Sequence, residues 1–144
     1  MTQQVPLDAR AEEIDRGDGT LEVAPDLAYR RLLMVNVDCP DPHALVAFYS
    51  RLLGWDVAHD EDQYGMVTQG GTAIGFGRVH PFTAPPWPDP DGAKQFHLDL
   101  AVDDLPAAAR FAESLGARRV SAPEVQEGFV VFLDPSGHPF CLCD

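Results

Sequence analysis

Two side chains that can move protons lie two residues apart in the segment QFHLDLAV, His97 and Asp99. The segment alternates in polarity, which is typical of a β-strand, so both side chains are expected on one face, about 6.5 Å apart along the strand. Both groups can then contact one substrate, with His97 as general acid or base. A direct pair between them is not expected at that distance. The alternative role for Asp99 is structural, as the cap of a turn or the partner of an arginine.

A second strand pattern covers residues 31 to 39, where polar and apolar residues again alternate. Its polar face carries Met34, Asn36 and Asp38, while Val35 and Val37 are expected to face the core. The polar face is therefore not expected to pack in the core, and we expect these three residues to bind a ligand together with His97, Asp99 and Cys141.

A proline-rich stretch, HPFTAPPWPDPDGAKQ, contains Phe82 and Trp87. Its prolines exclude a helix or a central strand, so it is expected to be a linker. Trp87 is a candidate ligand-binding residue that stacks on a flat molecule at a cavity mouth. The alternative is that both aromatics cover an apolar edge, since large aromatic side chains mainly contribute buried area.

His138 is a weaker candidate for a site residue because it lies in the turn DPSGHP. Asp, Pro and Gly each satisfy a position of a tight turn, so turn formation explains most of this segment.

The elements that would position these residues form a repeat. After the first strand, Asp41-Pro42 begins a helix with an apolar stripe that ends at Gly54, and three short strands follow. The same order recurs about 63 residues later, with a helix over 104 to 115. The predicted fold is therefore α+β, with two βαβββ repeats that form a curved open sheet around a cavity and carry their helices on the outer faces.

The expected organisation is a polar N-terminal extension, residues 1–28, followed by a single domain, residues 29–144. Within the domain the repeats span about 31–79 and 95–143, and the linker spans 80–94.

Three phrases carry a family resemblance: DPHALVAFYSRLLGWDV, FHLDLAVDDLPAAARFAESLGARRV and FVVFLDPSGHPFCL. They resemble the glyoxalase-like branch of the vicinal-oxygen-chelate superfamily, which includes glyoxalase I, bleomycin-resistance proteins and extradiol dioxygenases. The resemblance covers roughly residues 31 to 143. It implies a cavity between the repeats and, by similarity to the drug-sequestering members, a homodimer.

The resemblance also implies where a metal would bind. Metal-using members place ligands at positions that correspond to Met34, about Gly75, His97 and Cys141. Only His97 is a residue of the usual kind, so we expect no typical divalent metal site and no cofactor. The alternative is zinc held by His97 and Cys141 through nitrogen and sulfur, with Asp99 or Asp38 as a third ligand.

Composition excludes several classes of partner. The chain has 10 Lys and Arg against 23 Asp and Glu, a net charge of −13, which repels nucleic acid and anionic lipid surfaces. No apolar run approaches the ~20 residues of a membrane-spanning helix, so we expect a cytoplasmic protein. Three cysteines are too few and odd in number for a disulfide framework, and buried reduced thiols are expected.

Two functions remain open. The first is a glyoxalase-like protein that binds a small molecule in the cavity between its repeats. The second is a lyase or isomerase that acts on a small carbonyl or hydroxylated metabolite, with His97 as acid or base. The fold alone does not choose between them.

Overall fold

The computed structural model describes residues 13–15, 21–23, 31–86, 96–120 and 128–144. The chain divides into two compact units, residues 1–31 and 32–144. The first contains two short antiparallel strands, β1 (Glu13–Asp15) and β2 (Leu21–Val23). This hairpin was not predicted, because runs of three residues are too short to display a period.

The first half of the larger unit is built in the order predicted. It contains β3 (Met34–Cys39), α1 (Pro42–Leu53), β4 (Asp56–Asp60), β5 (Tyr64–Gln69) and β6 (Thr72–Arg78). Its sheet has the order β3-β6-β5-β4, with β3 parallel to β6 and the other pairs antiparallel. Asp41 caps α1 by accepting a hydrogen bond from the His43 backbone N–H at 3.1 Å.

The second half repeats this arrangement. It contains β7 (Leu98–Ala101), α2 (Leu105–Ser114), β8 (Arg118–Arg119), β9 (Phe129–Leu133) and β10 (Pro139–Cys143), in the sheet order β7-β10-β9-β8. The two predicted βαβββ repeats are confirmed. The first strand of each half begins about three residues later than its polarity pattern, because pairing starts only at Met34 with Ala73 and at Leu98 with Phe140.

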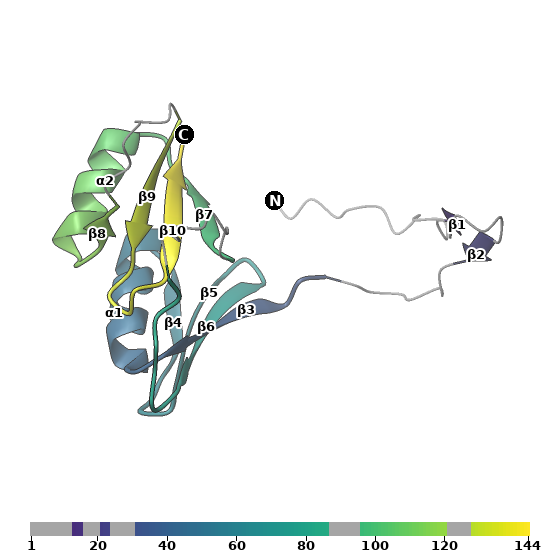
Figure 1. Cartoon of the computed structure of the whole chain (residues 1–144), viewed down its shortest axis with the longest axis horizontal. Helices are drawn as coiled ribbons and strands as arrows, with labels where there is room; N and C mark the ends of the chain where they lie inside the picture. Colours follow the sequence, from purple (N-terminus) through teal and green to yellow (C-terminus); the bar gives the residue numbers. More distant parts are fainter. Residues whose placement is uncertain (1–12, 16–20, 24–30, 87–95, 121–127) are drawn as a thin grey trace. The chain divides into compact units, whose positions relative to one another are not determined.

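Each helix covers its own sheet (Figure 1), α1 on β4, β5 and β6, and α2 on β9 and β10. Between the halves lies an aromatic core. The Tyr49 ring stacks on Phe76 at 5.4 Å, and Phe48 of the same helix meets Phe140 edge-on at 5.8 Å. Phe140 in turn stacks on Phe132 at 5.5 Å. One helix of the first half therefore packs into the second half, and the two repeats share a single hydrophobic core.

A buried hydrogen bond joins the halves at the same place. The Tyr49 hydroxyl donates to Asp134 Oδ2 at 2.7 Å, while Asp134 Oδ1 accepts from the backbone N–H groups of Ser136 and His138. Asp134 is only 4% exposed, and burial raises its pKa above the ordinary value while these donors oppose the rise. Asp134 thus organises the turn before β10 and attaches it to α1.

Candidate functional site

A pocket of about 480 Å³ lies between the two half-sheets. Strands β3 and β7 are each an edge strand of their sheet. Residues of both strands line the pocket. Its remaining walls come from α1, the linker and the turn before β10. The lining is mainly apolar, with a few polar groups, and consists of Val35, Asn36, Val37, Asp38, Tyr49, Val79, Phe82, Thr83, Pro85, Phe96, His97, Leu98, His138 and Pro139.

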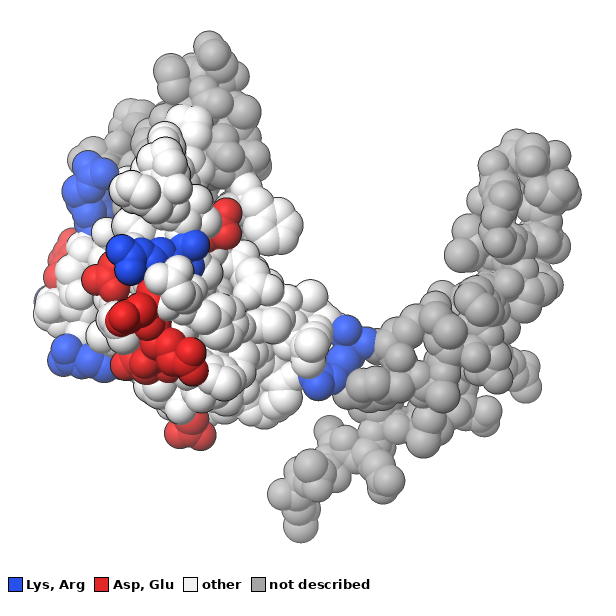
Figure 2. Space-filling model, turned by 90° about the horizontal axis from the view of Figure 1, so that it is seen from below, with Lys and Arg blue, Asp and Glu red and all other residues white. Residues whose placement is uncertain are grey.

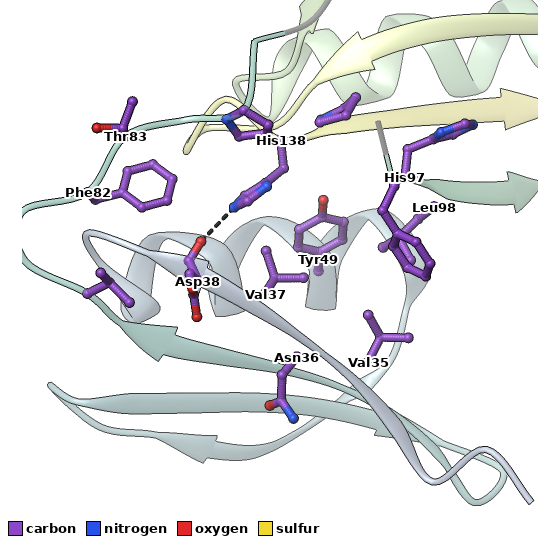
Figure 3. Close-up of a pocket in the computed structure, with 14 residues that line it drawn as sticks. Val35, Asn36, Val37, Asp38, Tyr49, Phe82, Thr83, His97, Leu98 and His138 are labelled. Carbon is purple, nitrogen blue, oxygen red and sulfur yellow. Dashed lines mark hydrogen bonds between the residues drawn. The ribbon is translucent and has the colours of Figure 1, made fainter. Parts of the chain in front are cut away.

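Strand β3 contributes to the pocket differently from the prediction. Asn36 and Asp38 line it, but so do Val35 and Val37, which were expected to be core residues only. Figure 3 shows Asn36 on the opposite side of the strand from the two valines. Both sides of β3 reach the pocket because β3 is an edge strand, with a hydrogen-bonded neighbour only in β6 among the described residues. Met34 does not line the pocket.

Leu98 of β7 and His97, the residue before this strand, line the pocket, whereas Asp99 of β7 does not. His97 Nε2 lies 3.3 Å from Asp99 Oδ1, so the expectation of no direct pair was wrong. The expected separation applied to Cα positions two residues apart along a strand, but here the side chains approach one another at their ends. The His97 side chain is 25% exposed and that of Asp99 is 65% exposed.

Cys141 lies beside this pair and away from the pocket lining. In the parallel pairing of β10 with β7 it is the direct partner of Asp99. Burial, the negative charge of Asp99 and a hydrogen bond to Asp99 together raise the pKa of the Cys141 thiol to about 12. The thiol is therefore protonated at neutral pH and is no nucleophile.

His138 lines the pocket, although its position in a turn made it a weaker candidate in the sequence. Its Nε2 lies 2.6 Å from the backbone carbonyl oxygen of Asp38, a bond that joins the second half to the end of β3 (Figure 3). Because a carbonyl only accepts, Nε2 carries the proton and Nδ1 is the acceptor of the neutral ring. The sequence could not reveal this bond, since its partners are 100 residues apart.

The linker forms one wall of the pocket. Phe82 faces the His138 ring with 5.7 Å between centroids, and Thr83 and Pro85 follow it along the wall. Trp87, the other aromatic candidate, lies outside the described residues. Tyr49, Val79 and Phe96 also line the pocket, and sequence reasoning did not single them out. The apolar stripe of α1 identified Tyr49 only as a core residue.

The donor set does not fit the metal site implied by the resemblance. Gly75 is the partner of Asn36 in the β3–β6 pairing. A Cβ atom there would lie 2.3 Å from Asn36 Oδ1, 2.7 Å from the Tyr64 hydroxyl and 2.9 Å from Met34 Cε. Three neighbouring side chains thus fill the space that a ligand side chain at position 75 would need. Met34, at the other position, offers only a thioether, so neither of these two positions supplies a suitable ligand for a hard divalent ion.

Comparison with known proteins agrees with this architecture. Residues 34–143 match the family model described as a glyoxalase-like domain. The chain belongs to this family. No curated protein matches the sequence. The fold is that of the vicinal-oxygen-chelate superfamily, as the resemblance implied.

Solved structures support the fold of this glyoxalase-like domain. One is a glyoxalase/bleomycin resistance protein/dioxygenase family enzyme from Burkholderia phytofirmans PsJN, with 21% identity and a TM-score of 0.62 over 78% of this chain and 97% of that one. Another is a glyoxalase family protein from Enterococcus faecalis, with 19% identity and a TM-score of 0.60 over 82% of this chain and 100% of that one. Neither helix of the described domain has the length and apolar character needed to span a membrane.

Proposed function

We propose that this glyoxalase-like protein binds a small organic molecule in the pocket between β3 and β7. The observation that carries the proposal is the pocket itself. Its volume of about 480 Å³ is within the usual range of ligand sites, and its lining combines apolar walls with few polar groups. The polar groups, chiefly Asn36, Asp38, His97 and His138, would fix the orientation of the ligand.

The lining also favours a chemical class of ligand. Among the described lining residues, Asp38 is the only acidic one, and none is Lys or Arg. Phe82 and Phe96 add aromatic faces, which attract cations. The whole chain carries a net charge of −13, and the face seen in Figure 2 has a cluster of acidic side chains with basic side chains beside it. A flat cationic amine therefore suits the pocket better than an anionic compound.

Calorimetric titration with matched ligands tests this proposal. We expect an aromatic amine cation to bind at least about tenfold more tightly than its uncharged isostere, about 1.4 kcal/mol in binding free energy. Asp38→Asn should remove most of this difference, while Asp103→Asn, outside the pocket, should retain it. Binding that is indifferent to ligand charge would reject the cationic class, and the absence of any saturable binding across a broad screen would reject the proposal.

A second candidate is the lyase or isomerase activity, and the contact between His97 and Asp99 favours it. Their separation of 3.3 Å allows Asp99 to orient the imidazole as it gains or loses a proton. In this role the enzyme would convert a small carbonyl or hydroxylated compound in the same pocket. Turnover that is lost in both His97→Gln and Asp99→Asn, with binding retained, would select this candidate over simple binding.

We also propose that the protein is a homodimer. Large apolar side chains are exposed near the starts of the two edge strands, with Leu32 at 71%, Leu33 at 59% and Phe96 at 90% exposure. Exposed apolar groups of this kind mark association surfaces. Sedimentation analysis at micromolar concentration should give the mass of two chains, and a mass of one chain would exclude the dimer.

A further inference from the structure

We propose that the Tyr49 hydroxyl is a specificity-determining group that selects ligands able to donate a hydrogen bond. The cation in the pocket would then carry N–H groups, as a primary amine or an amidine does, and would not be a quaternary ammonium ion. This inference rests on the proposed binding function and specifies the chemistry of the ligand. Tyr49 lines the pocket from α1, and Figure 3 shows its hydroxyl pointing away from Val37 and toward the second half.

The hydrogen-bond role of this hydroxyl is fixed by a residue behind the pocket wall. A tyrosine hydroxyl has one proton to donate and can also accept. The Tyr49 proton goes to Asp134 Oδ2 at 2.7 Å. Hydrogen bonds to a carboxylate are stronger than those between neutral groups, so the proton is held there. The hydroxyl oxygen can therefore only accept a further hydrogen bond, from a ligand that has a donor.

The surroundings of Asp134 keep the bond in this direction. Asp134 Oδ1 accepts from the backbone N–H groups of Ser136 at 2.9 Å and His138 at 3.0 Å. Burial raises the pKa of Asp134, and the bonds from Tyr49 and His138 oppose the rise. An ionised carboxylate has no proton to give, so it cannot reverse the bond to Tyr49.

A second pocket group is fixed in the same sense. The Nε2 atom of His138 lies 2.6 Å from the backbone oxygen of Asp38, which leaves Nδ1 as the acceptor of the neutral ring. The carboxylate of Asp38 is itself an acceptor. Asn36 and Thr83, which also line the pocket, can donate or accept and so favour neither kind of ligand. The polar groups whose role is fixed thus call for a ligand that donates.

Charge alone does not make this distinction. A primary ammonium ion and a quaternary ammonium ion are both attracted by Asp38 and by the aromatic faces of Phe82 and Phe96. Only the primary ion has N–H groups to offer Tyr49. Because Tyr49 is only 1% exposed, water compensates little for an acceptor that the ligand leaves unmatched. The pocket should therefore discriminate between two cations of equal charge.

Calorimetric titration of the full-length protein at about pH 8 tests this inference with phenethylamine, which is protonated there, and its N,N,N-trimethyl derivative. We expect the natural protein to bind the primary amine at least about tenfold more tightly. Tyr49→Phe should reduce this preference to less than about threefold. Tyr64→Phe, outside the pocket lining, is the matched control and should retain it. The size difference between the two compounds is the same for every variant, so a lost preference reports the hydrogen bond.

Asp134→Asn gives a readout that a purely structural role would not produce. The carboxamide oxygen can still accept from the two backbone N–H groups, while its NH₂ group donates to Tyr49. The Tyr49 proton is then free to donate to a ligand. Benzylacetone, an uncharged ketone that only accepts, should bind this variant at least about threefold more tightly than it binds the natural protein, and phenethylamine should bind more weakly. Weaker binding of both compounds would mean that Asp134 only maintains the fold.

Each outcome separates this inference from the proposed function. Equal affinity of the natural protein for the two ammonium ions, or a preference that survives in Tyr49→Phe, would overturn the selection by Tyr49 and leave the binding of cations intact. Saturable binding of neither ion would overturn both. The comparison on the natural protein needs no variant, so it decides the question even if Tyr49→Phe folds poorly.

Discussion

At the scale of single residues, the packing around Gly75 leaves little room for a side chain. The ends of the Met34, Asn36 and Tyr64 side chains converge over it, and a Cβ atom would lie within 3 Å of each. Real Cβ atoms do not tolerate such contacts, so these side chains would have to move. This glycine is needed because of its neighbours, since its backbone does not adopt a positive φ angle.

Gly75→Ala should therefore destabilise the protein by about 1–3 kcal/mol, the usual cost of overpacking. Gly77→Ala is the matched control, because it lies on the same strand and a Cβ there meets nothing within 4 Å. The control should change stability by less than about 1 kcal/mol. Urea unfolding measures both, and equal losses in the two variants would show that the crowding over Gly75 is unimportant.

The sequence could predict which residues alternate along β3 and β7, because alternation is a local property of strands. It could not predict that Val35, Val37 and Leu98 line the pocket, since this depends on how two edge strands lie relative to one another. The approach of His97 to Asp99 was missed for a related reason, because rotamers adjust to neighbours outside the strand.

At the scale of secondary structure, α1 is held at both ends. The N-terminal cap is Asp41, and the C-terminal cap is Gly54, which has a φ of 67°. Both caps were predicted from their residue types. A third contact was not predictable. The His43 side chain, in the first turn of α1, lies between Asp60, the last residue of β4, and Asp62, in the turn that follows. It connects the helix to a turn about 17 residues later.

The contact should make stability depend on pH. Hydrogen bonds to Asp62 and then to Asp60 raise the pKa of His43 above its ordinary 6.5, because the ring donates to both carboxylates only when protonated. Its stabilising effect is fully present below about pH 6.5 and is lost as the pH rises through the raised value. The pKa of Asp62 is lowered by the same contact. On the acid side, the stabilisation is therefore lost as the pH falls through the lowered pKa of Asp62.

His43→Ala should remove this dependence in urea unfolding measured from pH 5 to pH 9. His59→Ala is the control, because His59 makes neither of the two hydrogen bonds and only approaches Glu61 at 3.8 Å. The control should keep the loss of stability on the alkaline side. An unchanged pH profile in His43→Ala would mean that the contact contributes nothing in solution.

At the scale of the whole molecule, the repeats act as one domain because α1 packs into both. The glyoxalase-like fold was predictable from the repeated pattern of strand, helix and three strands, together with the phrases around each helix. The bond between Tyr49 and Asp134 was not, since it joins residues 85 positions apart. Short-range patterns identify the elements, whereas contacts between halves depend on tertiary packing.

Tyr49→Phe should cost about 1–3 kcal/mol of stability, because buried Asp134 loses its side-chain donor. Tyr64→Phe is a suitable comparison. Within the described residues, the Tyr64 hydroxyl donates one hydrogen bond, to the Met66 sulfur at 3.7 Å, and sulfur is a weak acceptor. We expect that variant to lose less than about 1 kcal/mol. Equal stability of Tyr49→Phe and the natural protein would contradict the role of this bond in joining the halves.

The central claim is that the pocket between β3 and β7 binds a small molecule, and NMR chemical-shift mapping tests it most directly. Addition of the tightest-binding aromatic amine should shift the backbone amides of Val35, Val37, Leu98 and His138, which come from both halves. Residues of the shallow groove beside α2, such as Ala107 and Phe111, should not move. Saturable shifts centred on that groove, with none at β3 and β7, would contradict the account.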